Sequence, residues 1–181
     1  MQMTNLTNSH IVMQLLKTQS HVFYAGEHCG DWRSAPPESQ RCVFHLVTQG
    51  QCHMQVHENE SMELQQGEVA LFLQPTAHYL QASSSQPTQL LCGYMEFINP
   101  LSAAIVQQLP SHVRYNTQQH EGLKHVMALI QLEVQSQDED QRMQSVLLPQ
   151  LCDLLLAYVL RDLMAQPVNK MSYGLMSMAQ D

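Results

Sequence analysis

The hydrophobic residues of this chain follow two different periods. Between about residues 20 and 98, short apolar runs alternate with polar turns. Within 51–57, Cys52, Met54 and Val56 fall on one face and polar residues on the other, as in a strand with one buried face. Short strands at regular spacing predict an antiparallel barrel or sandwich. We expect strands over 20–26, 41–50, 51–57, 61–65, 67–73, 77–82 and 88–97.

After Asn99-Pro100 the period lengthens to that of a helix. Residues 121–135 and 144–166 each carry an apolar stripe, and a short polar connection separates them. Pro149 either kinks the second helix or occupies its first turn. The pattern therefore predicts an antiparallel helical hairpin.

The two parts are expected to form one structural domain, mainly β with additional α-helix. Residues 1–98 would form the barrel, preceded by a short helix or arm, and residues 99–181 the hairpin. The stripe on the second helix is wide enough to cover a face of the barrel and also to leave a surface for a second copy. Candidates for a homodimer interface are Leu151, Leu154, Leu155, Tyr158 and Val159.

Composition and charge narrow the possible functions. Hydrophobic residues make up 44% of the 181 residues, which is enough for a folded core. The net charge of −8 argues against DNA binding by this chain alone, because such domains carry a basic surface. No apolar run is long enough to span a membrane, and no signal peptide is visible, so we expect a cytoplasmic protein.

Five short motifs occur in an order typical of one family. They are EHCGDW (27–32), FHLVTQG (44–50), GEVALFLQPTAH (67–78), LLCGYMEF (90–97) and LCDLLLAYVLRDL (151–163). Together they resemble the cupin-like N-terminal sensory domains of AraC-type transcriptional regulators. The resemblance implies a jelly-roll type antiparallel β-barrel followed by the helical hairpin. No single motif is specific, whereas the ordered set covers most of the chain.

The resemblance also implies a function. Such domains bind a signal and form homodimers, and a helix-turn-helix domain that normally follows them binds the DNA. The present chain stops at Asp181, where that domain would begin, so we expect either a sensory fragment or a stand-alone sensor. The expected partners are a small-molecule effector or an oxidant and a second copy, with DNA reached only through the absent domain, no membrane and no cofactor.

Four residues are candidates for the ligand pocket. His45 lies in an apolar row with Val43 and Val47, and His78 follows the next buried strand. Both histidines could be polar groups of a pocket, hydrogen-bonded core residues, or a partial metal-ligand set. The usual His-x-His pair of metal-binding cupins is missing, which weakens the case for a metal site. A metal-dependent cupin enzyme using His45 and His78 is nevertheless an alternative function, and a stand-alone ligand-binding module is another. Trp32 and Tyr94 complete the candidates.

Two cysteines are candidates for redox sensing. There are five cysteines and no C-x-x-C pair, which argues against a disulfide framework or a zinc knuckle. Cys29 and Cys92 match cysteine positions that recur in the family. A sensor needs accessible thiolates whose Cα atoms can approach, whereas the alternative for each residue is a buried thiol acting as a small hydrophobe.

Overall fold

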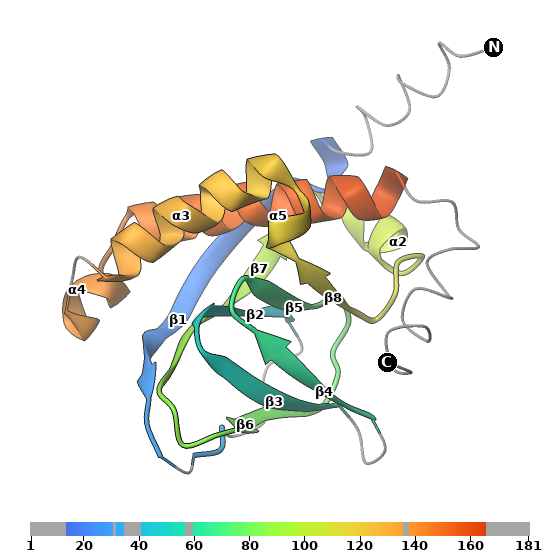
Figure 1. Cartoon of the computed structure of the whole chain (residues 1–181). Coiled ribbons are helices and arrows are strands. Elements are labelled where there is room, and N and C mark those ends of the chain that lie inside the picture. Colours follow the sequence, from blue (N-terminus) through green and yellow to red (C-terminus); the bar gives the residue numbers. More distant parts are fainter. Residues whose placement is uncertain (1–13, 31, 35–40, 57–59, 136–137, 166–181) are drawn as a thin grey trace.

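The fold consists of two antiparallel sheets and a layer of helices (Figure 1). The computed structural model describes residues 14–30, 32–34, 41–56, 60–135 and 138–165. The predicted opening helix lies almost wholly outside these residues. The fold class predicted from the sequence is confirmed, and the described strands form a two-sheet sandwich of the cupin type rather than a closed barrel.

The larger sheet has five strands in the order β1-β7-β2-β5-β8. Their bounds are β1 Thr18–His28, β7 Thr88–Phe97, β2 Cys42–Gln49, β5 Glu68–Phe72 and β8 His112–Asn116. The sequence predicted the first four of these strands. It missed β8, which lies beyond residue 98 in the part expected to be helical and pairs with β5 at the edge of the sheet.

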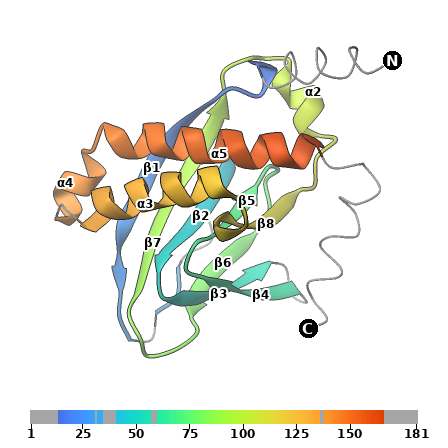
Figure 2. The ribbon, with the colours of Figure 1, turned by 45° about the horizontal axis from the view of Figure 1, so that its top comes forward.

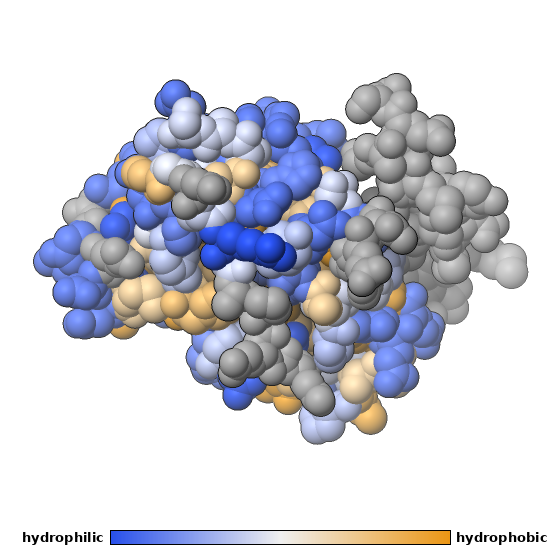
Figure 3. All heavy atoms as spheres, turned by 90° about the horizontal axis from the view of Figure 1, so that it is seen from below, coloured by the Kyte–Doolittle hydropathy of each residue, from blue (hydrophilic) through white to orange (hydrophobic). Residues whose placement is uncertain are grey.

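The smaller sheet has three strands in the order β4-β3-β6, with β3 Gln51–Val56, β4 Glu60–Gln65 and β6 His78–Ala82. Its inner face is apolar, as the alternation in β3 predicted, because Cys52, Met54 and Val56 are all buried. The side of the molecule opposite the helices is mostly hydrophilic, with hydrophobic residues in separate patches (Figure 3).

The helices cover the outer face of the larger sheet (Figures 1 and 2). They are α2 Ser102–Val106, the 3-10 turn η1 Thr117–Gln119, α3 Glu121–Gln135, α4 Glu139–Met143 and α5 Leu147–Ala165. The predicted hairpin is formed by α3 and α5, with α4 in the polar connection, and Pro149 occupies the first turn of α5. Among the residues that the structure describes, no helix has the length and apolarity needed to cross a membrane.

The stripe on α5 packs on the chain's own sheet, which corrects part of the predicted dimer interface. Leu155 and Val159 are buried in the core between the helices and the sheet, and Leu151 and Tyr158 pack against that core. Of the five candidates only Leu154 is exposed, at 45%. The helix period could not separate these cases, because a stripe that covers the protein's own sheet has the same spacing as one that binds a second copy.

A close backbone approach occurs at Gly93 in β7. A Cβ atom at this residue would lie 2.5 Å from the carbonyl oxygen of His21 and 2.5 Å from the ring of Phe44. The facing strand β1 has a bulge between Val22 and Tyr24. A side chain at residue 93 would therefore clash with the paired strand β1 and with the Phe44 ring, so this position requires glycine.

Candidate functional site

Two predicted pocket residues, His45 and His78, meet in the layer between the two sheets. β2 places His45 between Cys92 on β7 and Ala70 on β5, so that its side chain points toward the smaller sheet. His78 is the first residue of β6 and points back from that sheet. Their Nε2 atoms lie 2.7 Å apart, and both side chains are buried. Sequence periodicity predicted the inward direction of His45 but not its partner.

The hydrogen bonds of this pair define the tautomers. His78 Nδ1 lies 2.7 Å from the carbonyl oxygen of Thr76, which can only accept, so Nδ1 carries the proton. In neutral His78 the Nε2 atom is therefore an acceptor, and Nε2–H of His45 donates to it. His45 Nδ1 then has a free lone pair, and this buried atom has no hydrogen-bond partner among the described residues.

Burial keeps both histidines neutral. It lowers the pKa of His45 to about 3, and the neighbouring His78 lowers it further. Burial also lowers the pKa of His78, against the opposite effect of its bond to the Thr76 carbonyl. The ring of Phe72 stacks on His78 with centroids 3.7 Å apart, so the pair is held by an aromatic contact as well as by hydrogen bonds.

One ion pair and one histidine–carboxylate contact close the same layer on the side of β8. Nε2 of His112 lies 3.0 Å from Oε1 of Glu60, which joins the larger sheet to β4 of the smaller one. Arg114 donates to Glu68 at 2.8 Å. The other carboxylate oxygen of Glu68 accepts the backbone N–H of Gln65 at 2.9 Å. The charged groups facing the layer from this side are thus already partnered.

Trp32 borders the same layer on the side of β1. Its carbonyl oxygen accepts the backbone N–H of Ala82 at 3.0 Å, which adds this segment to the edge of β6. Its ring packs against the inter-sheet core and stacks on His28, which in turn stacks on Tyr24. The buried Nε1–H of Trp32 has no acceptor among the described residues. Among the described residues, the layer therefore holds an unpaired acceptor on His45 and an unpaired donor on Trp32.

Tyr94 lies farther along β7, two residues from Cys92 and on the same side of the strand. Its ring stacks on His21, with centroids 4.9 Å apart, and the guanidinium of Arg41 lies 4.3 Å from the ring centroid. Tyr94 is partly exposed. The structure thus places it beside the histidine pair along the sheet, with a surface cation as its partner.

The strand register separates the two cysteines of the predicted redox pair. Cys92 faces Tyr24 on β1, whereas Cys29 follows the end of that strand, beyond His28 and its partner Thr88. At about 3.3 Å per residue the Cα atoms are separated by more than about 13 Å along the strand, whereas a disulfide needs Cα atoms within about 7 Å. A disulfide between them therefore requires that the strands move apart.

The surroundings of both thiols favour the protonated form. A hydrogen bond to the Glu27 carboxylate raises the pKa of the exposed Cys29. Burial raises the pKa of Cys92. Both shifts favour the unreactive thiol over the thiolate. The sequence motif showed that cysteines were present but not which way they faced.

Comparison with known proteins places the chain in a family. A family model with the description Cupin matches residues 10–165. The chain belongs to the cupin family. The match supports the cupin-like N-terminal sensory domain that the sequence resembles. A search of curated proteins returns no match.

Solved structures similar to this cupin include two of ToxT from Vibrio cholerae. The ToxT of strain O395 bound to (E)-4-(8-methylnaphthalen-1-yl)but-3-enoic acid shares 10% identity, covering 81% of this chain and 56% of that one, with a TM-score of 0.49. The unsaturated fatty acid bound ToxT of strain SCE256 shares 11%, covering 85% and 55%, with a TM-score of 0.48. YhaK from Escherichia coli shares 11%, covering 55% and 40%, with a TM-score of 0.38. This cupin spans about half the length of the ToxT chains.

The histidine pair of this cupin does not fit a metal ion between its two nitrogens. Two nitrogen ligands of a tetrahedral zinc lie roughly 3.3 Å apart, because each bond is about 2.0–2.1 Å long. The 2.7 Å separation of the Nε2 atoms is that of a hydrogen bond. Within the described part of the chain, no group of three or more His, Cys, Asp or Glu side chains is placed to hold a metal.

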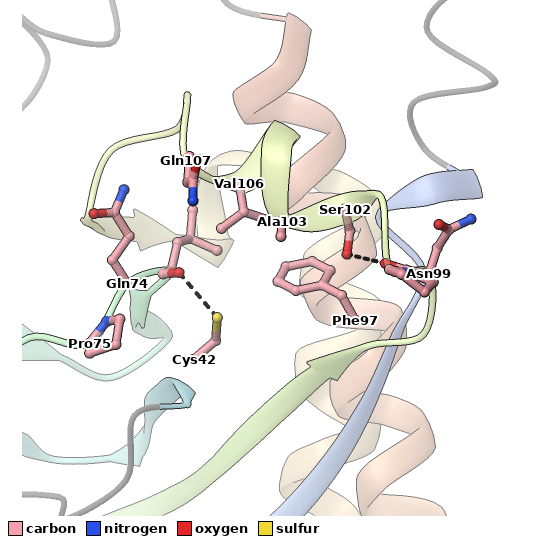
Figure 4. A pocket seen from close by; sticks show the side chains of 11 residues that line it. Cys42, Gln74, Pro75, Phe97, Asn99, Ser102, Ala103, Val106 and Gln107 are labelled. Atoms are coloured by element: carbon pink, nitrogen blue, oxygen red, sulfur yellow. Dashed lines mark hydrogen bonds between the residues drawn. The ribbon is translucent and has the colours of Figure 1, made fainter.

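A separate cavity lies at the end of the larger sheet, beside α2 (Figure 4). Its volume is about 490 Å³. The thiol of Cys42 donates to the carbonyl oxygen of Leu73 at 3.1 Å, and burial raises the pKa of Cys42 to about 11. Phe97 and Val106 supply apolar walls, and none of the lining residues is charged. The sequence did not mark this cavity, because its walls come from three separate segments, at residue 42, at 73–75 and at 97–107.

Proposed function

We propose that this cupin is the signal-sensing domain of an AraC-type transcriptional regulator and that a small-molecule effector binds between its two sheets. The family match over residues 10–165 supports a sensory cupin domain. A cytoplasmic location and a DNA-binding domain beyond Asp181 are parts of the same proposal.

The observation that carries the proposal is the unpaired Nδ1 of His45. Buried polar atoms are almost always hydrogen-bonded, and leaving one unpaired costs about 1–3 kcal/mol. His45 Nδ1 and Trp32 Nε1 are both buried without a partner in the described structure, and both residues belong to the inter-sheet layer. Ligand pockets combine apolar walls with a few such polar groups.

Hydrogen bonds connect both edges of the larger sheet to helix α5, so a change in the sheet can reach the helices. Asp153 of α5 accepts hydrogen bonds from Thr18 and Ser20 of β1, at 3.2 and 2.7 Å. At the opposite edge of the sheet, the hydroxyl of Tyr115 on β8 donates to Asp162 of α5 at 2.5 Å. A ligand that favours one separation of the two sheets would therefore bias the position of α5, provided that it binds the two arrangements with different affinity.

Homodimerisation is proposed through the exposed side of the helix pair instead of the buried stripe. Leu132 on α3 is 63% exposed and Val146, before α5, is 75% exposed. Exposed apolar residues that cluster on one part of a surface mark interaction sites. The residues proposed for the contact between two copies are Leu129, Leu132, Val146, Leu147 and Leu154.

The experiment is a binding screen with a defined site control. The purified chain is screened against small metabolites by thermal shift, and hits are repeated on His45→Phe. The control is His53→Phe, because His53 lies on β3 and bonds to Ser61 in an exposed position away from the layer. We expect hits that are lost in His45→Phe and kept in His53→Phe. Hits kept equally in both variants would refute binding between the sheets.

A further inference from the structure

We infer that the effector is an uncharged, largely apolar molecule that carries a hydrogen-bond donor, such as a hydroxyl or an amide N–H, and that His45 Nδ1 recognises this donor. This inference rests on the proposed function, because it assigns the chemical class of the effector that the inter-sheet layer takes. It follows from which atoms of the layer already have partners.

The donor requirement follows from a chain of hydrogen bonds that begins at the backbone. The Thr76 carbonyl accepts from His78, whose other nitrogen must then accept from His45. That leaves His45 with a lone pair at Nδ1, and His45 is only 6% exposed. An ether, a ketone or a carboxylate brings only lone pairs to this atom, whereas a hydroxyl or amide N–H completes the chain.

The exclusion of charged effectors follows from the contacts that already occupy the charged side chains around the layer. Arg114 is the cation that β8 contributes, and Glu68 already holds it at 2.8 Å. Glu60 is occupied by His112 at 3.0 Å. An anionic effector would therefore be transferred from water into the layer without finding a free cationic side chain on this side. A cationic effector would meet only the neutral side chains of His45 and His78. Burying an unpaired charge costs more free energy than a single hydrogen bond returns.

Trp32 adds a second requirement at the other side of the layer. Its unpaired Nε1–H needs an acceptor. A hydroxyl or amide group offers both a donor and an acceptor, which a simple ether or a hydrocarbon does not. The surrounding walls are apolar and include Phe72, Leu80 and Leu90. A molecule with an apolar body, a hydroxyl or amide N–H toward His45 and an acceptor toward Trp32 matches this lining.

The test uses matched probes that differ only in the polar group. The full chain with ¹⁵N-labelled histidine is titrated with cyclohexanol, methoxycyclohexane and cyclohexanecarboxylate, and the His45 Nδ1 resonance is followed. We expect cyclohexanol to bind about tenfold more tightly than either of the others and to shift that resonance, since one hydrogen bond is worth roughly this factor.

Two variants give the assignment a structural control. His45→Phe keeps an aromatic ring at this position but removes the Nδ1 acceptor, so we expect cyclohexanol binding to fall about tenfold and methoxycyclohexane binding to stay unchanged. His53→Phe alters an exposed histidine on β3 and should change neither. Unfolding midpoints of both variants show whether the fold is kept.

The possible results of these titrations test three separate points: the chemical class of the effector, the role of His45 Nδ1 and binding between the sheets. Cyclohexanecarboxylate or methoxycyclohexane binding as tightly as cyclohexanol at the His45 resonance would overturn the inferred class while leaving sensing between the sheets intact. Unchanged cyclohexanol binding in a folded His45→Phe would overturn the role of Nδ1. A resonance that reports a hydrogen-bonded Nδ1 in the free protein, and that no probe moves, would assign the atom to a buried water and contradict the proposed binding layer itself.

Discussion

The two faces of the larger sheet are buried in different ways. On the helix side the buried residues are almost all aliphatic, and Leu156, Val159 and Leu160 of α5 are fully buried. On the inner side, the layer against the smaller sheet mixes aliphatic residues with His45 and His78. An aliphatic layer supplies stability through packing, whereas a buried polar layer gives up stability unless every polar atom is paired. The difference separates the part of the molecule that holds the fold from the part proposed to bind the effector.

The largest expected effect is on the helix side. Leu156→Ala should lower the free energy of unfolding by about 2–5 kcal/mol, because it leaves a cavity in a layer that cannot relax. Urea denaturation measures this change, with Leu132→Ala as the exposed control. Binding by the folded fraction should be unaffected. A loss below about 1 kcal/mol would contradict the assignment of stability to this layer.

The inner layer should instead make stability depend on pH. His45 titrates near 6.5 when unfolded and near 3 when folded, so its stabilising effect is complete above pH 6.5 and is lost as the pH falls toward 3. The loss is about 1.4 kcal/mol per pH unit for one such histidine, and the lowered pKa of His78 acts in the same direction. His112 and Glu60 also face this region, with Nε2 of the histidine 3.0 Å from the carboxylate.

Urea denaturation at several pH values between 7 and 5 measures this dependence in the wild type and in His45→Phe. The variant should lose stability less steeply as the pH falls, because it lacks the proton that residue 45 takes up on unfolding. Equal slopes in the two proteins would show that His45 is not held neutral.

A smaller effect is expected where the sheet is tied to α5. Tyr115→Phe removes the hydrogen bond to Asp162 and should cost about 1 kcal/mol of unfolding free energy. Burial, together with this bond, raises the pKa of Tyr115 to about 12, so ultraviolet titration of the wild type should show a tyrosine ionising late. If this hydrogen bond couples effector binding to α5, Tyr115→Phe should bind the effector normally but lose the change in α5 that binding causes. An intact response would place the coupling at Asp153 alone.

The exposed side of the helices should affect assembly more than folding. Leu132→Glu or Leu154→Glu should turn a dimer into a monomer by light scattering and change the stability of the monomer by only about 0.5 kcal/mol. Leu155→Glu is a poor test of the interface, because Leu155 is buried in the chain's own core. Dimers that persist in both exposed variants would remove this surface as the interface.

The smallest expected change is chemical. Cys29 is exposed and Cys92 is buried, so a thiol reagent should label the first in the folded protein and the second only after unfolding. Mass spectrometry after peroxide treatment should find no bond between them. Formation of that disulfide in the folded protein would show that β1 separates from β7 and would restore the redox hypothesis.

The sequence was informative wherever a local period reported burial. Alternation in β3 predicted its buried face, and the stripe in 121–135 predicted α3 with the same bounds. The strand β8 was missed because it is short and largely polar, although Val113 and Tyr115 alternate with His112 and Arg114. For the candidate site, the row of Val43, His45 and Val47 predicted that His45 faces inward. Its contact with His78 could not be predicted, because it depends on how two sheets stack.

The sequence by itself determined which residues are buried. Burial follows from the hydrophobicity of each side chain and from the spacing of hydrophobic residues along the chain. Only the tertiary structure decided which buried polar atoms found partners. It paired Glu68 with Arg114 and His45 with His78, left Nδ1 of His45 without a partner among the described residues, and held Cys29 away from Cys92. Those outcomes depend on strand register and sheet stacking, which join residues far apart in the chain and leave no local pattern in it.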